Sequence, residues 1–147
     1  MCGIAGTLNL APRAPIDPEM VYTMLEAIRH RGPDENGVFA DEWVGLGSAR
    51  LSIIDLAGGR QPIHNEDGTV WVVFNGEIYN YVELRRELEA AGHVFSTHSD
   101  TEVLVHLYEE DERDWLLKLN GQFAIALWDQ KNQTLILARD RLGVRPV

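Results

Sequence analysis

Cysteine is almost absent from this sequence, whose 147 residues contain a single one at position 2. One thiol cannot form a disulfide within the chain, and it cannot supply the several thiolates of a cysteine-rich metal site. No apolar run approaches the roughly 20 residues of a membrane-spanning helix, and the N-terminus lacks the basic and apolar segments of a secretory signal. We therefore expect a cytoplasmic protein that has no membrane partner.

Positive charge is also scarce, because 13 Lys and Arg face 23 Asp and Glu, for a formal net charge of −10. Nucleic-acid binding depends on clustered cations that displace counterions from phosphates, so no nucleic-acid partner is expected. The sequence has no glycine-rich phosphate loop ending in Lys-Ser or Lys-Thr, so no nucleotide site is expected either. We interpret the acidic run at 109–112 as a solvated helix end.

The histidines share no spacing typical of zinc ligands. We interpret each of them as structural and predict no metal site: His30, His64, His93, His98 and His106.

Apolar periodicity and turn residues predict the secondary structure. A strand at 3–9 is followed by a helix that begins at the N-cap Asp17, with Pro18 in its first turn, and runs to about His30. Residues 70–74 form a continuous apolar run, typical of a strand that is covered on both faces. The other predicted elements are hairpins at 37–40 with 43–49 and at 122–129 with 134–140, a loop at 57–65, and helices opened by capping boxes at Asn80 with Glu83 and Ser99 with Glu102.

The predicted order is therefore strands, one helix, strands, helices and strands. This order lacks the regular alternation of strand and helix in a doubly wound parallel sheet. It predicts an α+β fold of layered antiparallel sheets. Residues 139–147 are too polar for a core, and we interpret them as the start of a linker.

Cys2 is the strongest candidate for a catalytic group. A lone cysteine is usually a small buried hydrophobe, but removal of Met1 would leave this one with a free α-amine. Such an amine has an ordinary pKa of about 7.7–8.0, so it is a base near working pH. One terminal residue would then hold both a nucleophile and a proton acceptor.

Asn75 and Gly76 directly follow the predicted buried strand. Asn-Gly is the strongest dipeptide signal for a hairpin turn, yet the next residues lead into a predicted helix and form no return strand. An amide side chain and a backbone N–H at a strand end can instead donate to an oxyanion. We favour the oxyanion interpretation.

Three charged residues match the needs of a free α-amino acid. Arg50 lies among apolar residues, where an arginine either forms a structural ion pair or binds a carboxylate in a bidentate manner. Glu77 and Asp100 are surface charges, or Asp100 is a helix cap, or the two together form a site for an ammonium group. The set therefore suits a ligand that carries both a carboxylate and an ammonium.

Seven motifs in order resemble the glutaminase domain of asparagine synthetases, which are class II glutamine amidotransferases of the N-terminal nucleophile hydrolase superfamily. The motifs are Met-Cys-Gly-Ile-Ala-Gly at 1–6, Arg-His-Arg-Gly-Pro-Asp at 29–34, Arg-Leu-Ser-Ile-Ile-Asp-Leu at 50–56, Gly-Gly-Arg-Gln-Pro at 58–62, Phe-Asn-Gly-Glu-Ile-Tyr-Asn at 74–80, Ser-Asp-Thr-Glu at 99–102 and Leu-Asn-Gly-Gln-Phe-Ala at 119–124.

The resemblance implies a four-layer αββα sandwich in which Cys2 attacks the amide of L-glutamine. It further implies that Asn75 and Gly76 form the oxyanion hole and that Arg50 holds the substrate carboxylate. The substrate ammonium would be held by Glu77 and Asp100.

For the organisation of the chain, the resemblance implies an amidotransferase domain at 1–138 and a linker at 139–147 toward a C-terminal synthetase domain. ATP and magnesium belong to that second domain, so no cofactor is expected in this one, and a homodimer is a further expected partner. Amidotransferases of glucosamine-phosphate and purine synthesis are the nearest alternatives, but they carry Thr-Arg-Trp-Ala-Thr-His-Gly where this chain has Ala-Arg-Leu-Ser at 49–52. A binding module that has lost turnover is the alternative from another class.

Overall fold

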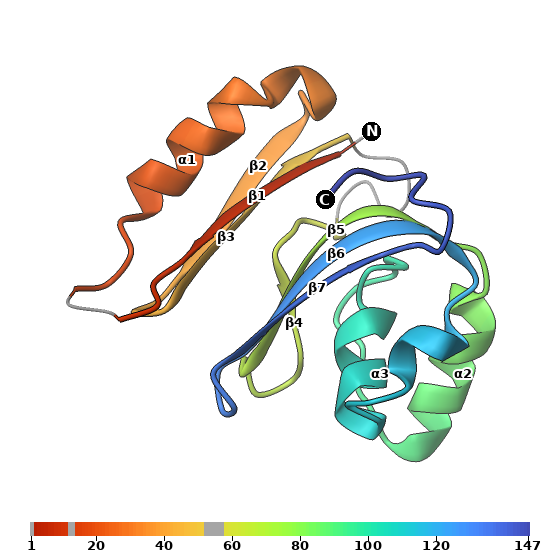
Figure 1. Ribbon diagram of the computed structural model, residues 1–147. Helices are drawn as coiled ribbons and strands as arrows, with labels where there is room; N and C mark the ends of the chain where they lie inside the picture. Colours follow the sequence, from red (N-terminus) through yellow and green to blue (C-terminus); the bar gives the residue numbers. More distant parts are fainter. Residues whose placement is uncertain (1, 12–13, 52–57) are drawn as a thin grey trace.

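The computed structural model describes residues 2–11, 14–51 and 58–147. Within these ranges the strands form two antiparallel sheets, and the helices lie outside them (Figure 1). The first sheet has the order β1-β3-β2, with β1 Gly3–Leu8, β2 Glu35–Ala40 and β3 Val44–Arg50. The second has the order β4-β5-β6-β7, with β4 Ile63–His64, β5 Val70–Ile78, β6 Gly121–Asp129 and β7 Thr134–Arg139.

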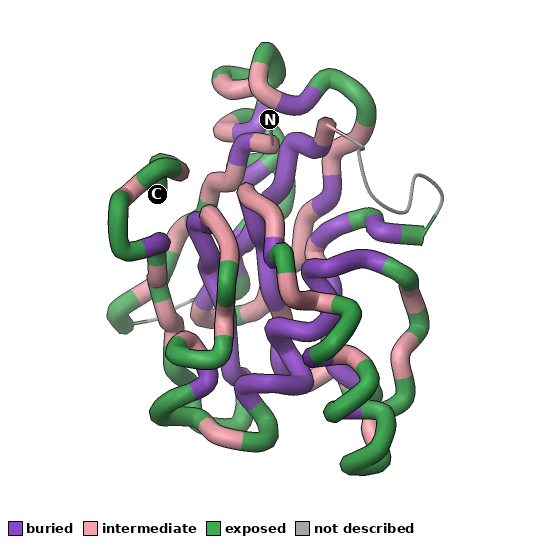
Figure 2. Tube along the Cα trace, turned by 90° about the vertical axis from the view of Figure 1, so that its right-hand side faces the viewer, coloured by how far each residue is buried: buried purple, intermediate pink, exposed green. Residues whose placement is uncertain are grey.

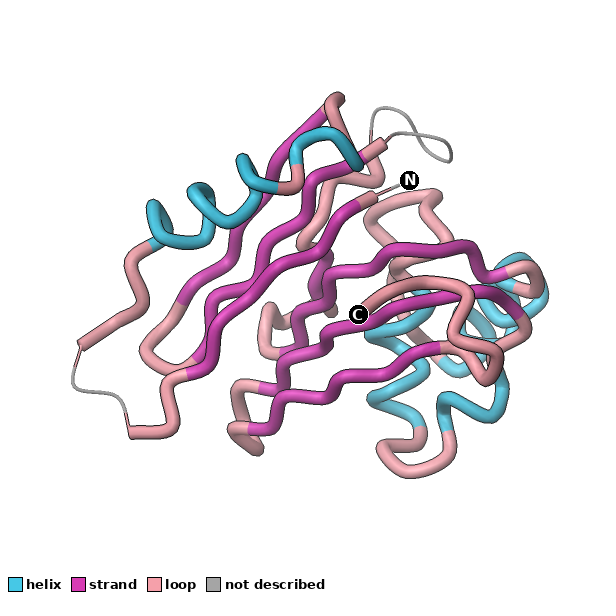
Figure 3. The backbone as a smooth tube through the Cα atoms, turned by 45° about the horizontal axis from the view of Figure 1, so that its top comes forward, coloured by secondary structure: helices cyan, strands magenta, loops and turns pink. Residues whose placement is uncertain are grey.

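The helices cover the two outer faces, so the molecule has four layers. Helix α1 (Pro18–Ala27) contacts all three strands of the first sheet, whereas α2 (Tyr81–Ala91) and α3 (Val103–Glu110) lie on the far side of the second sheet (Figure 1). The two sheets face each other in the middle, as Figure 3 shows from another side. The predicted α+β sandwich is confirmed. None of the helices in the described ranges has the length and apolar character needed to cross a bilayer.

The core is divided by the second sheet. A large apolar cluster fills the space between this sheet and the helices α2 and α3, and a smaller one lies between the two sheets. Successive residues of β5 alternate between them, since Val72 and Phe74 belong to the large cluster and Val73 to the small one. The predicted strand covered on both faces is therefore confirmed, and Figure 2 shows the buried backbone running along the central strands.

The predicted helix beginnings and hairpins are confirmed with small shifts of their ends. The Asp17 carboxylate caps α1 by accepting a hydrogen bond from the Glu19 N–H at 3.0 Å. Helix α1 ends at Ala27 and not near His30, and a 3-10 turn (η1, Arg29–Arg31) follows it. Gly32 then lies directly on β3, where a Cβ atom would be 2.0 Å from the Ala49 carbonyl oxygen, so only glycine fits at this close approach.

Both predicted capping boxes are wrong in their contacts, although helices follow them. The Asn80 side chain donates to the Lys118 carbonyl and accepts from the Asn120 N–H, so it ties α2 to the segment before β6. The Glu102 carboxylate accepts four hydrogen bonds from the backbone and hydroxyl groups of Ser96 and Thr97. The Ser99 hydroxyl does accept from the Thr101 N–H at 3.2 Å, but the glutamate half of that box is replaced by the loop contacts, and the Asn80 box is replaced by long-range contacts.

The predicted loop at 57–65 contains the short strand β4, and a second 3-10 helix (η2, Trp115–Lys118) was not predicted at all. Residue 57 of that loop, Met1, and residues 52–56 of the motif at 50–56 lie outside the described residues.

Candidate active site

A cavity of about 100 Å³ lies beside the start of β1, the end of β3 and the second half of β5. All six residues that the sequence marked as candidates line it. The lining residues are Cys2, Arg50, Leu51, Gln61, Phe74, Asn75, Gly76, Glu77, Ser99, Asp100, Thr101 and Arg145. Both sheets and the segment before α3 contribute, so the site exists only in the folded chain.

Cys2 is half-buried just before β1. The antiparallel register of β1 against β3 pairs Gly3 with Ala49, and this pairing brings the thiol next to Leu51. The Cys2 sulfur accepts a hydrogen bond from the Leu51 N–H at 3.4 Å and lies 3.7 Å from the Leu51 carbonyl oxygen. The Cys2 carbonyl also accepts from the Arg31 Nε at 3.3 Å, which ties the chain terminus to the turn after α1. The thiol is therefore held in place at the cavity wall.

Arg50 is the last residue of β3, and its side chain is only 6% exposed. The strand register places it opposite Glu35 of β2. Their side chains form an ion pair with 2.8 Å between Arg50 Nη1 and Glu35 Oε2. The ion pair confirms the structural alternative for this arginine, and Arg50 also lines the cavity, so its binding of a substrate carboxylate stays a prediction.

Asn75 and Gly76 do not form a turn. Both lie within β5, paired with Ala124 and Phe123 of β6, so the hairpin alternative is excluded and the strand extends past its predicted end. Asn75 is buried. A Cβ atom on Gly76 would lie 2.1 Å from the Gln122 carbonyl oxygen, so no other residue fits here without moving β6.

Glu77 and Asp100 form the acidic side of the cavity. Asp100 is buried, and its carboxylate accepts a hydrogen bond from the Ile78 N–H at 3.0 Å. Burial raises the pKa of Asp100, and the charge of Glu77 adds to the increase, while the Ile78 hydrogen bond opposes it. Two acidic groups in a partly desolvated position suit a cationic group of a ligand.

Sequence analysis missed several lining residues, of which Gln61 and Arg145 are the most informative. Gln61 is buried, donates to Thr101 Oγ1 at 3.3 Å and accepts from the Phe74 N–H at 2.7 Å, so it links two walls of the cavity. Its place in the Gly-Gly-Arg-Gln-Pro motif was the only signal.

Arg145 lies in the stretch that we interpreted as the start of a linker. The Asp140 carboxylate accepts hydrogen bonds from the N–H groups of Phe123, Val144 and Arg145, and this turn brings the last residues back against the sheet. The Arg145 Nε is buried and has no hydrogen-bond partner among the described residues. No local pattern in the sequence indicates this return.

A half-buried thiol, a buried guanidinium and two carboxylates therefore line one cavity in a fold of two antiparallel sheets, an arrangement that suits an enzyme acting on a small amino acid. The comparisons with known proteins give the family. The sequence model of the family described as "Glutamine amidotransferase domain" matches residues 1–147, and the chain belongs to this family.

Several curated relatives match the whole chain. Asparagine synthetase [glutamine-hydrolyzing] 1 of Bacillus subtilis (strain 168) is 48% identical over 149 residues, which cover 100% of this chain and 24% of the relative. The probable asparagine synthetase of Dictyostelium discoideum is 41% identical and asparagine synthetase 2 of Arabidopsis thaliana 42%, with 27% and 25% of their lengths covered. The chain therefore spans about a quarter of the length of these relatives.

Solved structures show the same fold at lower identity. Glutamine phosphoribosylpyrophosphate amidotransferase from B. subtilis, complexed with ADP and GMP, superposes with a TM-score of 0.71 at 23% identity, over 99% of this chain and 38% of that one. A structure described as the allosteric regulatory enzyme of purine biosynthesis gives a TM-score of 0.70 at 24% identity, over 88% of this chain and 36% of that one. These two superpositions confirm the predicted fold of layered antiparallel sheets.

Proposed function

We propose that this chain hydrolyses the side-chain amide of L-glutamine to glutamate and ammonia, with Cys2 as the nucleophile. The observation that carries the proposal is the convergence of the thiol, the buried Arg50 and the buried Asp100 on one cavity. Membership of the glutamine amidotransferase family supports the choice of substrate.

Glutamine binds through the two charged groups on its α-carbon. The Arg50 guanidinium receives the α-carboxylate, and Glu35, which pairs with it at 2.8 Å, fixes its orientation. Glu77 and Asp100 receive the α-ammonium. With both of these groups held, the side-chain amide at the other end of the molecule is directed toward Cys2.

The reaction then needs a base, a nucleophile and donors for an oxyanion. The α-amine exposed by removal of Met1 accepts the thiol proton, and the sulfur attacks the amide carbon. The Asn75 side-chain amide and the Gly76 N–H donate to the oxygen that becomes negatively charged. The carbon–nitrogen bond breaks, ammonia leaves with the returned proton, and a thioester joins Cys2 to the glutamyl group. Water then splits the thioester to glutamate and the free thiol.

The acceptor of the ammonia is the second part of the proposal. The relatives are named as glutamine-hydrolysing asparagine synthetases, and this chain matches about a quarter of their length. We infer that its ammonia passes to an ATP-dependent synthetase domain that follows residues 139–147 and amidates aspartate. The domain boundary at 138, a cytoplasmic location, homodimer formation and confinement of ATP and magnesium to the synthetase domain remain predictions.

Cys2→Ala tests the proposal. Alanine at position 2 still permits removal of Met1, so the variant differs from the native chain only in the thiol. Glutamine hydrolysis should fall by about 10⁴-fold or more, while calorimetry should still detect glutamine binding. Retained turnover in Cys2→Ala would reject Cys2 as the nucleophile. A native chain that binds glutamine without hydrolysing it would favour the binding-module alternative.

A further inference from the structure

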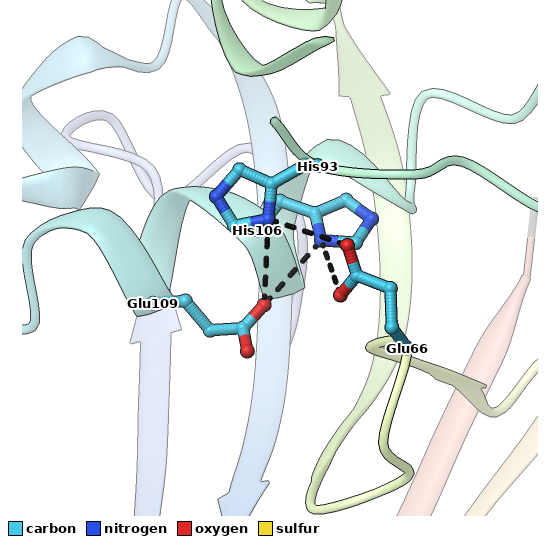
Figure 4. Close-up of side chains that lie close together, drawn as sticks. All are labelled: Glu66, His93, His106 and Glu109. Carbon is cyan, nitrogen blue, oxygen red and sulfur yellow. Dashed lines mark hydrogen bonds and ion pairs between the residues drawn. The ribbon is translucent and has the colours of Figure 1, made fainter. Parts of the chain in front are cut away.

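Four ligand-type side chains converge at a second place, outside the cavity of Cys2 (Figure 4). Glu66 comes from the turn between β4 and β5, His93 from the segment after α2, and His106 and Glu109 from α3. Because these segments are far apart in the sequence, the group has no spacing that sequence analysis could detect. None of the four lines the candidate active site.

The two histidines present the same ring nitrogen to the two glutamates. His106 Nδ1 lies 3.4 Å from an oxygen of Glu66 and 3.4 Å from an oxygen of Glu109. His93 Nδ1 lies 3.5 Å from the other Glu66 oxygen and 3.8 Å from the same Glu109 oxygen. One ligand atom from each residue can be chosen so that all four lie within 4.8 Å of one another.

These separations approach those of a tetrahedral zinc site. Bonds of about 2.0–2.2 Å from Zn²⁺ to His nitrogen and carboxylate oxygen place neighbouring ligand atoms about 3.3–3.6 Å apart. The four histidine–glutamate distances of 3.4 to 3.8 Å fall in or just beyond this range, although they involve both oxygens of Glu66. With one ligand atom from each residue, the separations reach up to 4.8 Å, so side-chain rotations must draw the four atoms closer around one ion.

Surrounding groups orient three of the four side chains. His93 Nε2, on the far side of the ring from Nδ1, lies 3.0 Å from a Glu110 oxygen, and such a carboxylate is the usual outer partner of a zinc-bound histidine. His106 is held by burial instead, since its Nε2 lies 3.8 Å from a Glu102 oxygen and has no hydrogen-bond partner among the described residues.

The two glutamates are positioned in the same way. Asn65 Nδ2 donates to Glu109 at 2.7 Å, and the Val94 N–H donates to Glu66 at 2.9 Å. Glu66, His93 and Glu109 thus each have a contact that fixes them from outside the group. His106 is fully buried and His93 is only 14% exposed in its side chain, so the nitrogen ligands are shielded from bulk water.

We propose that Glu66, His93, His106 and Glu109 bind one Zn²⁺ ion as a structural site. Two carboxylates balance the charge of the ion, and four protein ligands leave no open position for chemistry. The ion would tie the β4–β5 turn to α3 and to the end of α2, so its contribution is to the stability of the helical layer. It takes no part in glutamine hydrolysis.

The competing explanation is an ion-pair cluster without metal. Protonated imidazoles could neutralise the glutamates, since the same four histidine–glutamate contacts are also short enough for ion pairs. The two explanations differ in what the native protein contains and in what zinc adds to its stability.

Zinc titration of the untagged chain, first dialysed against a chelator, separates them. We expect calorimetry to show one equivalent of Zn²⁺ bound and the Tm to rise with zinc concentration. Co²⁺ in place of Zn²⁺ should give the intense visible absorption of a four-coordinate ion.

Variants assign the binding to this group. His93→Gln and Glu66→Gln each remove one ligand from a partly exposed position and should abolish stoichiometric binding, whereas His30→Gln, a histidine outside the group, should leave it unchanged. His106 is too deeply buried for a clean variant. Glu110→Ala leaves all four ligands in place and should weaken binding by roughly 10- to 100-fold by removing the outer partner of His93.

Absence of stoichiometric binding to the native chain would overturn the proposal. Binding of equal strength in His93→Gln, Glu66→Gln and the native chain would overturn it as well. Circular dichroism of each variant shows whether a loss of zinc binding is due to a loss of folding. Because Glu110 is exposed, Glu110→Ala should keep the fold whether or not the site binds zinc.

Discussion

At the scale of single residues, the candidate site combines groups that are held rigidly by their neighbours. Cys2 is fixed through Leu51 and Arg31, and Arg50 through Glu35. Side chains positioned in this way lose little freedom when a substrate binds, so binding energy is available for orientation.

Asp100 gives a pH-dependent prediction. Burial raises its folded-state pKa above the ordinary value of 3.8, so it becomes neutral on acidification earlier than an exposed aspartate. A neutral Asp100 cannot attract the substrate ammonium, and the KM for glutamine should therefore rise as the pH falls through that raised pKa. Steady-state kinetics from neutral to acidic pH measures the effect.

Asp100→Asn is the control for this effect. Its KM should be roughly tenfold or more above that of the native chain at neutral pH, because hydrogen bonds to charged groups contribute about 1.5–3 kcal/mol. The variant should also lose most of the change in KM at acidic pH. An equally steep rise in KM for Asp100→Asn would show that another group titrates.

At the scale of secondary-structure elements, Asp41 joins the two sheets. One oxygen of Asp41 accepts from the Trp43 and Val44 N–H groups at 2.7 and 2.8 Å, within the turn between β2 and β3. The other oxygen accepts from Trp128 Nε1 at 2.8 Å and from Gln130 Nε2 at 3.3 Å, at the end of β6. The turn was predicted from the sequence, but its contact with the second sheet was not.

Asp41→Ala should therefore destabilise the fold. The buried Trp128 indole N–H would lose its acceptor, and leaving such a donor unpaired costs about 1–3 kcal/mol. Chemical denaturation should show a loss of stability in this range, whereas Glu42→Ala, at the exposed neighbouring position, should change it by no more than about 0.5 kcal/mol. Equal effects of the two substitutions would contradict the role of Asp41.

The elements that were predictable are those decided by neighbouring residues. Asp17 before Pro18 marks the start of α1, and Gly92 ends α2 with a φ of 112° that favours glycine. The capping boxes failed because distant partners took the side chains, as Lys118 and Asn120 did with Asn80. A local sequence pattern cannot predict that a distant group will bind the side chain in place of the helix end.

The candidate site divides along the same line. Residue type and sequence context were enough to predict three residues of the site, Cys2, Arg50 and Asp100. Tertiary contacts alone bring two others to the cavity, Gln61 and Arg145. Arg145 in particular depends on the Asp140 turn, which a composition-based linker interpretation could not foresee.

At the scale of the whole molecule, the proposed division of labour predicts what this chain does alone. Incubated with glutamine, aspartate, ATP and magnesium, it should form glutamate and ammonia in equal amounts and no asparagine, because the ATP-dependent step belongs to the second domain. Amino-acid chromatography with an ammonia assay measures all three products. ATP-dependent asparagine from these 147 residues would contradict this division.

The central claim is that Cys2 acts as both nucleophile and base, which requires a free α-amine. The direct measurement is glutamine turnover by one preparation whose N-terminal extension is cleaved immediately before Cys2, with mass spectrometry recording the terminus. Turnover should rise from background in step with the fraction of chains that begin at Cys2. Full turnover by the uncleaved chains, in which the Cys2 nitrogen is an amide, would contradict the account.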